Sequence, residues 1–336
     1  MDNNGQLGIL VVGHGSPRRE ANDGFIALVG RIAGRLGGVT VLPTFFSIAR
    51  PSIEDRVAEL ASQGVRRVVL LPYFLYSGQH VTGDIPELLA KCRREHPQLD
   101  ISVLPTLENE PLLEDLLVDR LADLLPAMEL PPGGKAIEAR SHAIIESQIG
   151  PLEAADPARR AVVRRIIHAT ADLSLGRSLR IHPQAIQRGL EAIRTRRPII
   201  CDVKMVVAGI TKVDCPKLCA IGDADVIARS GPGLTRAAAA IEKLADQLDG
   251  SIVAVGNAPT ALWKLMEIAR AGGPRPALVV GLPVGFVGAR ESKLALIDSG
   301  LCYIANTTAR GGSPAACAAV NALATLASAH GAAAGQ

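Results

Sequence analysis

GILVVG, at Gly8–Gly13, is the stretch that decides the fold class. Its consecutive apolar residues predict a short strand buried on both faces, and a helical pattern over Glu20–Leu36 follows it. Similar apolar runs occur at Val65–Leu71 and Ile101–Leu104. Because such strands alternate with helical patterns, the sequence predicts a parallel sheet built from β-α-β units. The other helices expected in this block are Ser52–Ser62, Ile85–Arg94 and Leu112–Leu125.

A break in this pattern lies at Pro126–Lys135, which contains PAMELPPGGK. Proline and glycine interrupt helices and strands alike, so we expect a first domain at 1–125, a linker at 126–136 and a second domain at 137–330. The length of 336 residues suits two domains. The second block repeats the alternation, so both halves are expected to be α/β. Its expected strands are Ile199–Val203, Val226–Arg229, Ile252–Gly256 and Ala277–Leu282, and its expected helices are Ile137–Ile149, Pro157–Ala171, Pro183–Arg194, Leu234–Leu248, Ala258–Ala271 and Pro314–Ala329.

Composition restricts the class of protein. Hydrophobic residues make up 48% of the chain and charged residues 21%, which is typical of packed cores. A net charge of +3 is too small to indicate nucleic-acid binding. The N-terminus lacks a secretory pattern and no apolar run reaches the roughly 18 residues of a membrane span, so we expect a cytoplasmic protein with reduced thiols and no membrane partner. Cys215 and Cys219 form a C-x3-C pair, which indicates metal only weakly, since small buried or loop cysteines explain it as well.

Two histidines follow predicted strands in the first block. His14 lies between two glycines directly after Gly8–Gly13, and His80 lies after the second predicted strand. Since the carboxyl ends of parallel strands share one edge of a sheet, both imidazoles could bind one divalent metal and accept protons from a macrocycle that the metal enters. Alternatively, each histidine only forms hydrogen bonds within its loop. The residues alone leave both interpretations open.

The motifs around these histidines resemble the small sirohydrochlorin cobaltochelatase family. GHGS at 13–16 and PYFLYSGQHVTGDIP at 72–86 carry the resemblance, which covers about residues 7–125. It implies a chelatase-like parallel α/β sandwich that inserts Co²⁺, as a substrate, into sirohydrochlorin without ATP. It also implies that His14 and His80 bind the metal and accept protons, with His14 as the catalytic residue. The implied tetrapyrrole contacts are Ser47, Phe74, Leu75, Tyr76, Ser77, Gly78 and Gln79.

The first block departs from that family at three positions. Ser47 and Arg50 stand where carboxylates are common, and Pro17 replaces the usual arginine after GHGS. A lost carboxylate could change the metal preference or slow metal delivery. Two alternatives therefore stay open for this block: a module that binds or transfers tetrapyrroles without inserting metal, and a chelatase for iron or nickel.

A third histidine, His168, lies in a helical pattern of the second block. Arg165 precedes it by three residues on the same helix face, so the guanidinium disfavours a second positive charge until a polyanion binds. This setting suits protonation of a ligand, although a packed or capping histidine fits the pattern too.

Four glycine-rich turns in the second block could bind anionic oxygens through backbone N–H groups, and each could equally be a plain β-α turn. No G-x-G-x-x-G fingerprint follows these strands, which disfavours a dinucleotide-binding domain. The turns are Gly231–Gly233, Gly256–Thr260, Gly285–Gly288 and Gly311–Ser313.

The second block resembles precorrin-8X methylmutase over about residues 137–329. One departure is His142, where phenylalanine is usual. The resemblance implies a Rossmann-like parallel-sheet domain that acts as a homodimer. The motifs, in the family's order, are ARSHAII at 139–145, RIIHATAD at 165–172, CDVKMVVAGI at 201–210, VGNAPTALW at 255–263, LPVGFVGARESK at 282–293 and RGGS at 310–313.

This resemblance implies an isomerisation in cobalamin biosynthesis. A methyl group moves from carbon 11 to carbon 12 of precorrin-8X or cobalt-precorrin-8, which gives hydrogenobyrinate or cobyrinate. His168 would protonate the macrocycle as the general acid, and no nucleotide or redox cofactor is implied. The pairing with a chelatase-like domain favours a substrate that already carries cobalt, and a nucleotide-binding α/β protein is the remaining alternative. The implied substrate contacts are Ser141, Arg165, Asn257, Gly311, Gly312 and Ser313.

Overall fold

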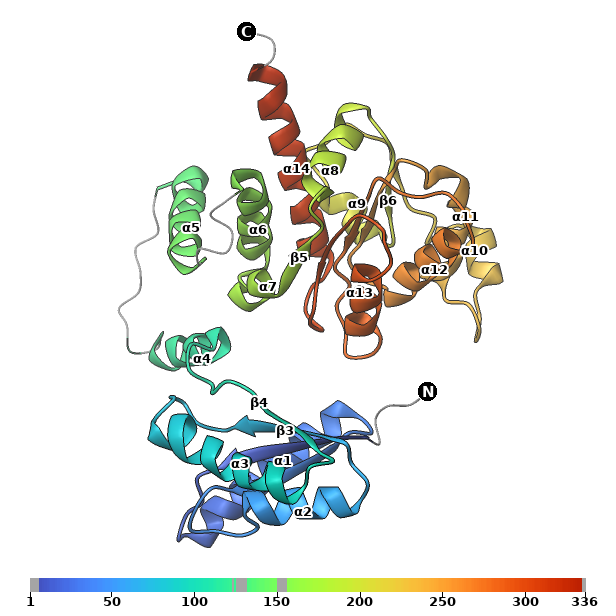
Figure 1. Cartoon of the computed structure of the whole chain (residues 1–336). Helices are drawn as coiled ribbons and strands as arrows, with labels where there is room; N and C mark the ends of the chain where they lie inside the picture. The colour runs from blue at the N-terminus through green and yellow to red at the C-terminus, as the bar shows by residue number, and fades with distance from the viewer. Residues whose placement is uncertain (1–5, 123, 125–131, 150–155, 334–336) are drawn as a thin grey trace. The chain divides into compact units, whose positions relative to one another are not determined.

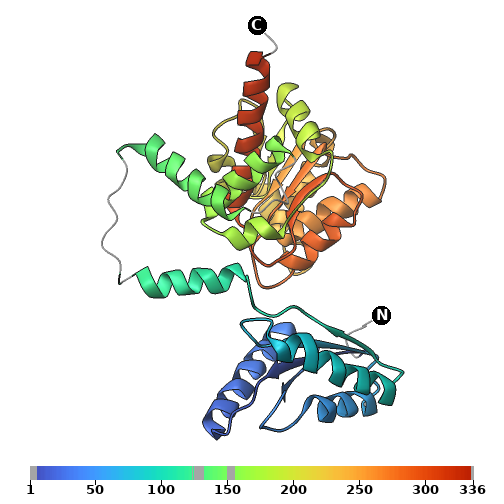
Figure 2. The same cartoon turned by 60° about the vertical axis from the view of Figure 1, so that its left-hand side comes forward.

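The computed structural model describes residues 6–122, 124, 132–149 and 156–333. The chain divides into two compact units, Met1–Pro126 and Ala127–Gln336, and each has a sheet of its own (Figures 1 and 2). Among the described residues, no helix is both long and apolar enough to cross a membrane.

The first unit is a four-stranded parallel sheet with helices on both faces (Figure 1). Its strands are β1 (Leu7–Gly13), β2 (Thr40–Phe45), β3 (Arg67–Pro72) and β4 (Asp100–Val103), and its helices are α1 (Arg19–Leu36), α2 (Ile53–Ser62), the π-helical turn η2 (His80–Asp84), α3 (Ile85–Glu95) and α4 (Pro111–Ala122). The strand order is β2-β1-β3-β4, and all three pairings are parallel. The predicted β-α-β architecture is confirmed in this unit.

Each face of this sheet is covered by its own core. Val11 of β1 packs in a cluster with Val29 of α1, whereas Leu10 and Val12 belong to the cluster that includes α2 and α3. Successive side chains of a strand point to opposite faces, so a strand covered on both sides must be apolar throughout. That requirement explains GILVVG.

Strand β2 is absent from the strands predicted above, and its sequence explains why. Pro43 lies in its middle, and proline cannot donate a hydrogen bond within a sheet. β2 lies at the edge of the sheet and pairs only with β1, so one of its sides needs no partner. The placement of His80 after the second strand was therefore wrong: His80 follows β3, the third strand along the chain.

The second unit is a six-stranded sheet in the order β5-β10-β9-β8-β6-β7. Its strands are β5 (Leu179–Ile181), β6 (Ile199–Cys201), β7 (Lys217–Leu218), β8 (Ile252–Val255), β9 (Leu278–Gly281) and β10 (Tyr303–Asn306). Its helices are α5 (Gly134–Gln148), α6 (Pro157–Thr170), α7 (Leu173–Ser178), α8 (Ala185–Arg194), α9 (Lys204–Gly209), α10 (Ala224–Arg229), α11 (Arg236–Lys243), the 3₁₀ turn η4 (Ala245–Gln247), α12 (Pro259–Arg270), α13 (Ala289–Ile297) and α14 (Ser313–Ala333). The pairings are parallel except at the edge, where β5 runs antiparallel to β10.

Helices cover both faces of this sheet as well (Figure 2). Residues of α6, α8, α9 and α14 form one core with alternate strand residues such as Ile252 and Leu278. Residues of α11, α12 and α13 form the other core with their neighbours Val253 and Val279. Many of the α14 side chains in the first of these cores are alanine, and this helix packs directly on β8 and β9.

Three expectations for the second unit need correction. Val226–Arg229 is not a strand but the end of α10, and only Val226 of it is buried, which fits one helix face rather than a covered strand. The turn Gly231–Gly233 consequently follows a helix. Helix α5 begins at Gly134, inside the predicted linker, while residues 125–131 of that region lie outside the described residues.

Candidate functional site

His14 and His80 meet at the carboxyl ends of β1 and β3. Their ring centroids lie 5.6 Å apart, and both side chains are exposed. Phe46, which follows β2, lies against the pair, with its ring centroid 4.7 Å from that of His80 and 6.3 Å from that of His14. Three neighbouring strands thus deliver two imidazoles and one aromatic ring to the same edge of the sheet.

Each imidazole is oriented through its Nδ1 atom. His80 Nδ1 lies 2.7 Å from an Asp84 carboxylate oxygen one helical turn away, and His14 Nδ1 lies 3.2 Å from the Gly15 carbonyl oxygen. Such contacts favour a proton on Nδ1 and leave Nε2 as the atom for a metal or a macrocycle proton. In the described parts of the chain, no group of three or more His, Cys, Asp and Glu side chains is arranged to hold a metal.

The loop after β2 is tied to His14 by its backbone. Ser47 N donates to the His14 carbonyl oxygen at 2.9 Å, and the Ser47 carbonyl oxygen closes against Gly15. A side chain at Gly15 would place its Cβ 2.0 Å from that oxygen, and φ there is +90°, so only glycine fits. Arg50 pairs with Asp55 at 2.7 Å, and the hydrogen bonds from Ser52 and Arg50 lower the pKa of Asp55 to about 2.

The predicted tetrapyrrole segment lies between β3 and η2. Leu75 is 53% exposed and Tyr76 is 78% exposed, which is unusual for large apolar side chains and leaves them available to a ligand. Ser77 anchors the segment, because its N–H donates to a Glu108 carboxylate oxygen at 2.6 Å. Ser77, Gly78 and Gln79 are also exposed, and Phe74 is half-buried.

In the second unit, Ser141 and His168 form a hydrogen-bonded pair between α5 and α6. Ser141 Oγ lies 2.8 Å from His168 Nδ1, and both side chains are half-buried. The His142 ring stands edge-on to His168, with the centroids 5.2 Å apart. Burial lowers the pKa of His142, and the positive charges of Arg164 and His168 lower it further. A proton on His168 therefore makes protonation of His142 less favourable, while the Glu138 carboxylate acts in the opposite direction.

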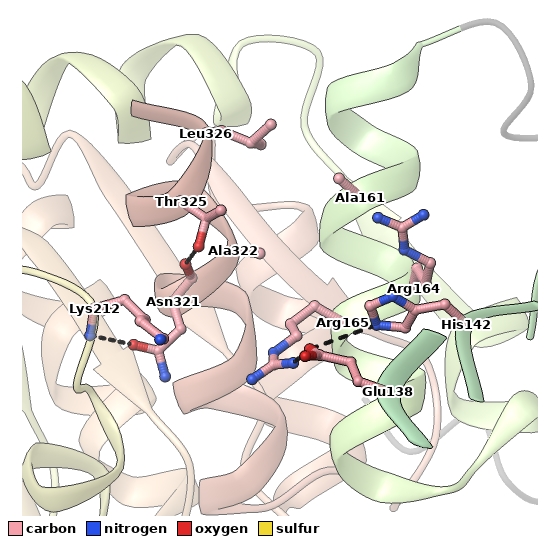
Figure 3. A pocket seen from close by; sticks show the side chains of 10 residues that line it. All are labelled: Glu138, His142, Ala161, Arg164, Arg165, Lys212, Asn321, Ala322, Thr325 and Leu326. Atoms are coloured by element: carbon pink, nitrogen blue, oxygen red, sulfur yellow. Dashed lines mark hydrogen bonds and ion pairs between the residues drawn. The ribbon is translucent and has the colours of Figure 1, made fainter. Parts of the chain in front are cut away.

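A pocket of about 410 Å³ lies beside this pair, between α5 and α6 on one side and α14 on the other (Figure 3). Arg165 lines it and pairs with Glu138 at 2.7 Å, and Arg164 and Lys212 add two more positive charges. Anionic ligands suit such a lining. The lining residues are Glu138, His142, Ala161, Arg164, Arg165, Lys212, Asn321, Ala322, Thr325 and Leu326.

Of the site residues predicted for the second unit, Arg165 lines this pocket, whereas Ser141 and His168 lie next to its lining residue His142. The other predicted contacts lie at the ends of β8 and β10 and do not line it. Asn257 follows β8, whereas Gly311, Gly312 and Ser313 lead into α14. The two turns touch each other, because a Cβ at Gly256 would lie only 2.7 Å from Ser313 Cα. The structure thus forms two groups of predicted residues: one around His168, and one at the strand ends.

Two buried charged residues that sequence analysis missed hold the strand-end turns. Asp202, at the end of β6, accepts hydrogen bonds from the backbone N–H groups of residues 256, 257 and 258 at 2.8–3.1 Å. Burial raises its pKa, although these hydrogen bonds act in the opposite direction. Lys293 Nζ donates to the carbonyl oxygens of Pro283 and Arg310 at 3.0 and 2.6 Å, and burial lowers its pKa to about 8. Both residues lie in motifs quoted above, but no spacing signals their burial.

These features define the second unit as a doubly wound α/β domain with a serine–histidine pair beside a cationic pocket, an arrangement that suits an anionic ligand. The precorrin-8X methylmutase family model matches residues 136–326, and the CbiX family model matches residues 8–124. The chain belongs to the precorrin-8X methylmutase family and carries a CbiX-family domain ahead of the methylmutase domain.

Similar proteins agree with this assignment. The cobalt-precorrin-8 methylmutase of Priestia megaterium is 41% identical over 197 residues, which cover 57% of this chain and 87% of the relative. The precorrin-8X methylmutase of Pseudomonas aeruginosa is 43% identical over 201 residues, 57% of this chain and 95% of the relative. The crystal structure of precorrin-8X methylmutase from Thermus thermophilus matches with a TM-score of 0.54 and 38% identity, over 58% of this chain and 99% of that one. The chain is thus a methylmutase, an isomerase of cobalamin biosynthesis.

Proposed function

We propose that the second unit moves a methyl group from carbon 11 to carbon 12 of precorrin-8X or cobalt-precorrin-8, with His168 as the general acid. The observation that carries this proposal is the 2.8 Å hydrogen bond between Ser141 Oγ and His168 Nδ1. It fixes the ring and leaves Nε2 to face a ligand. The identity of 41–43% with methylmutases supports the reaction.

The proposed sequence of events conserves every atom of the substrate. His168, protonated on both nitrogens, donates Nδ1–H to Ser141 Oγ and transfers the Nε2 proton to the macrocycle. The added charge draws electron density from carbon 11, so the bond from that carbon to the methyl group breaks as the bond to carbon 12 forms. A proton then returns from the ring system to Nε2, and the product is an isomer of the substrate. Neither a redox step nor a nucleotide is involved.

Electrostatics in the pocket support a substrate with several carboxylates. Arg165 and Lys212 lie on opposite walls and can bind separate carboxylates, which holds the ring in one orientation (Figure 3). The contacts implied for Asn257, Gly311, Gly312 and Ser313 belong to the same proposal. A homodimer is proposed as well, and the exposed apolar side chains of Phe286 and Val287, 93% and 89% accessible, are available for such an interface.

The test is isomerisation of precorrin-8X by purified protein, followed by absorbance. We expect His168→Ala to reduce kcat by about 10²–10⁴-fold, as loss of a general acid does, with KM changed little. Ser141→Ala should reduce kcat less, since the imidazole remains. If His168→Ala keeps the wild-type kcat, His168 is not the acid. Light scattering on the wild type tests the dimer.

For the first unit we propose insertion of Co²⁺ into sirohydrochlorin, with His14 and His80 as metal ligands and proton acceptors. The 5.6 Å separation of the two rings supports it, since two Nε2 atoms can approach one ion. Exposed Leu75 and Tyr76 offer apolar surface to a flat macrocycle. All six cysteines are free thiols and five of them are buried, so the proposed compartment is the reducing cytoplasm.

Anaerobic incubation with sirohydrochlorin and Co²⁺ tests this second activity. Wild type should convert the spectrum of free sirohydrochlorin, whereas His14→Ala and His80→Ala should not. Fe²⁺ and Ni²⁺ in parallel reactions reveal a different metal preference. If the wild type binds sirohydrochlorin but inserts no metal, the unit is a tetrapyrrole-binding module. The first cause to examine is then Arg50, which stands where a carboxylate is common and pairs with Asp55.

A further inference from the structure

Arg165, the pocket residue proposed to bind a substrate carboxylate, already has a carboxylate partner within the chain. Glu138 Oε1 lies 2.7 Å from Arg165 Nη1, and Figure 3 shows the Glu138 carboxylate in front of the guanidinium, inside the pocket. The Glu138 side chain is 46% exposed and that of Arg165 is 35% exposed, so the pair stands at the surface that a ligand must approach. A carboxylate of the substrate and the carboxylate of Glu138 would need the same place at Arg165.

The rest of the pocket favours an incoming anion. Arg164 Nη1 lies 3.2 Å from a carboxylate oxygen of Glu146, a residue that does not line the pocket. For Lys212 Nζ, no carboxylate partner occurs among the residues that the structure describes. The charged side chains that line the pocket are one carboxylate, that of Glu138, and three cations, those of Arg164, Arg165 and Lys212. Replacing the internal carboxylate by one from a ligand is therefore electrostatically feasible.

Glu138 also has a second partner within reach. Its Oε1 lies 3.9 Å from His142 Nε2, and this nitrogen is buried and has no hydrogen-bond partner (Figure 3). A small rotation of the Glu138 side chain would bring the two into hydrogen-bond distance. An imidazole N–H can donate to a carboxylate even when the ring is neutral. Glu138 can thus release Arg165 without losing its own hydrogen bond.

We propose that Glu138 occupies, in the ligand-free protein, the position at Arg165 that a side-chain carboxylate of the corrinoid takes on binding, and that the displaced Glu138 turns to His142. This inference rests on the proposed function, which makes Arg165 a substrate-binding residue. Glu138 is then an affinity-determining residue: it competes with the substrate's carboxylate and does not touch the migrating methyl group.

Binding of the product tests the inference. Hydrogenobyrinate is titrated into wild type and Glu138→Gln under equilibrium conditions, with the quenching of Trp263 fluorescence or the corrinoid absorbance as the signal. A neutral amide competes poorly for a guanidinium, so Glu138→Gln should bind roughly threefold to tenfold more tightly. KM for the substrate should fall in the same proportion while kcat stays within about twofold.

Two controls make the result specific. Glu242→Gln removes a carboxylate that pairs with Arg229 at 2.9 Å and is 41% exposed, so it repeats the charge change away from the pocket and should leave affinity unchanged. A corrinoid whose side chains are all amides should gain nothing from Glu138→Gln. His142→Phe in the wild-type background should weaken binding, because the displaced Glu138 would lack its second partner.

The outcomes separate this inference from the function on which it rests. If wild type isomerises precorrin-8X and Glu138→Gln binds the product equally or more weakly, Glu138 orients Arg165 instead of competing, and only the inference fails. If wild type neither binds the product nor turns over the substrate, the proposed function fails and the inference with it.

Discussion

At the scale of single residues, Lys293 is the side chain whose environment is most unusual. It is fully buried, and its ammonium group is held by two backbone carbonyl oxygens, of Pro283 and Arg310. These carbonyls belong to the turns after β9 and β10. We predict that Lys293→Met destabilises the second unit by about 1–3 kcal/mol at pH 7, because both acceptors lose their donor. Unfolding by guanidinium, followed through Trp263, the chain's single tryptophan, measures it.

The same residue makes stability depend on pH in a predictable direction. Burial lowers the pKa of Lys293 from 10.5 to about 8, so between these values the unfolded chain binds more protons than the folded one. Stability contributed by this group therefore rises as pH increases from about 8 to 10. The Lys293→Met variant lacks this rise in stability with pH. The difference in the free energy of unfolding between wild type and variant should therefore be larger at pH 9.5 than at pH 7. An equal difference at both pH values would contradict the lowered pKa.

Individual residues also show what the sequence could and could not predict. His14, His80, Ser141 and His168 stand in motifs, and the structure brings them together in pairs. Lys293 stands in a motif as well, but its burial depends on helices and turns from distant parts of the chain. A charged residue in a sequence is expected on the surface, so only tertiary structure reveals it as a support inside the protein.

At the scale of elements, the same limit applies to short strands. The covered runs at β1, β3, β8 and β9 were predicted because continuous apolar residues are needed between two helical layers. β10 reads YIAN and ends in a buried asparagine, which no strand pattern requires. α10 contains two consecutive apolar residues, Val226 and Ile227, a pattern that fits a strand as well as a helix. Pairing with the distant strands β5 and β9 forms β10, and local sequence does not encode that pairing.

The contact between the β8 turn and α14 yields a prediction at this scale. A Cβ at Gly256 would lie 2.7 Å from Ser313 Cα and 3.0 Å from Ser313 N, and backbone atoms cannot yield as a flexible side chain can. Gly256→Ala should therefore separate the two turns, destabilise the second unit by about 1–3 kcal/mol and lower isomerase activity. Gly233→Ala, where no atom lies within 4 Å of the added Cβ, is the matched control and should be nearly neutral. Equal stability of the two variants would show that the turns can move apart freely.

At the scale of the whole molecule, the hydrophobic cores determine how the chain behaves when it is divided. Two clusters serve the first sheet and three serve the second unit, and no cluster among the described residues draws side chains from both. Because burial of apolar surface supplies most of the stabilisation of a fold, each unit should be stable without the other. The two proposed reactions also act on different tetrapyrroles, so neither requires the other's site.

We therefore predict that a fragment of residues 132–336 unfolds, by Trp263 fluorescence, within about 2 °C of the full chain and keeps its kcat for isomerisation. The fragment 1–125 should retain any metal insertion that the full chain shows. Its α4 leaves Leu116, Leu117 and Val118 51–64% exposed, so this fragment is expected to self-associate at high concentration, and Leu117→Lys is the variant that should prevent it. A second-unit fragment that melts well below the full chain would instead demonstrate a stabilising interaction between the units, and the fusion would then serve folding rather than only joint production of the two domains.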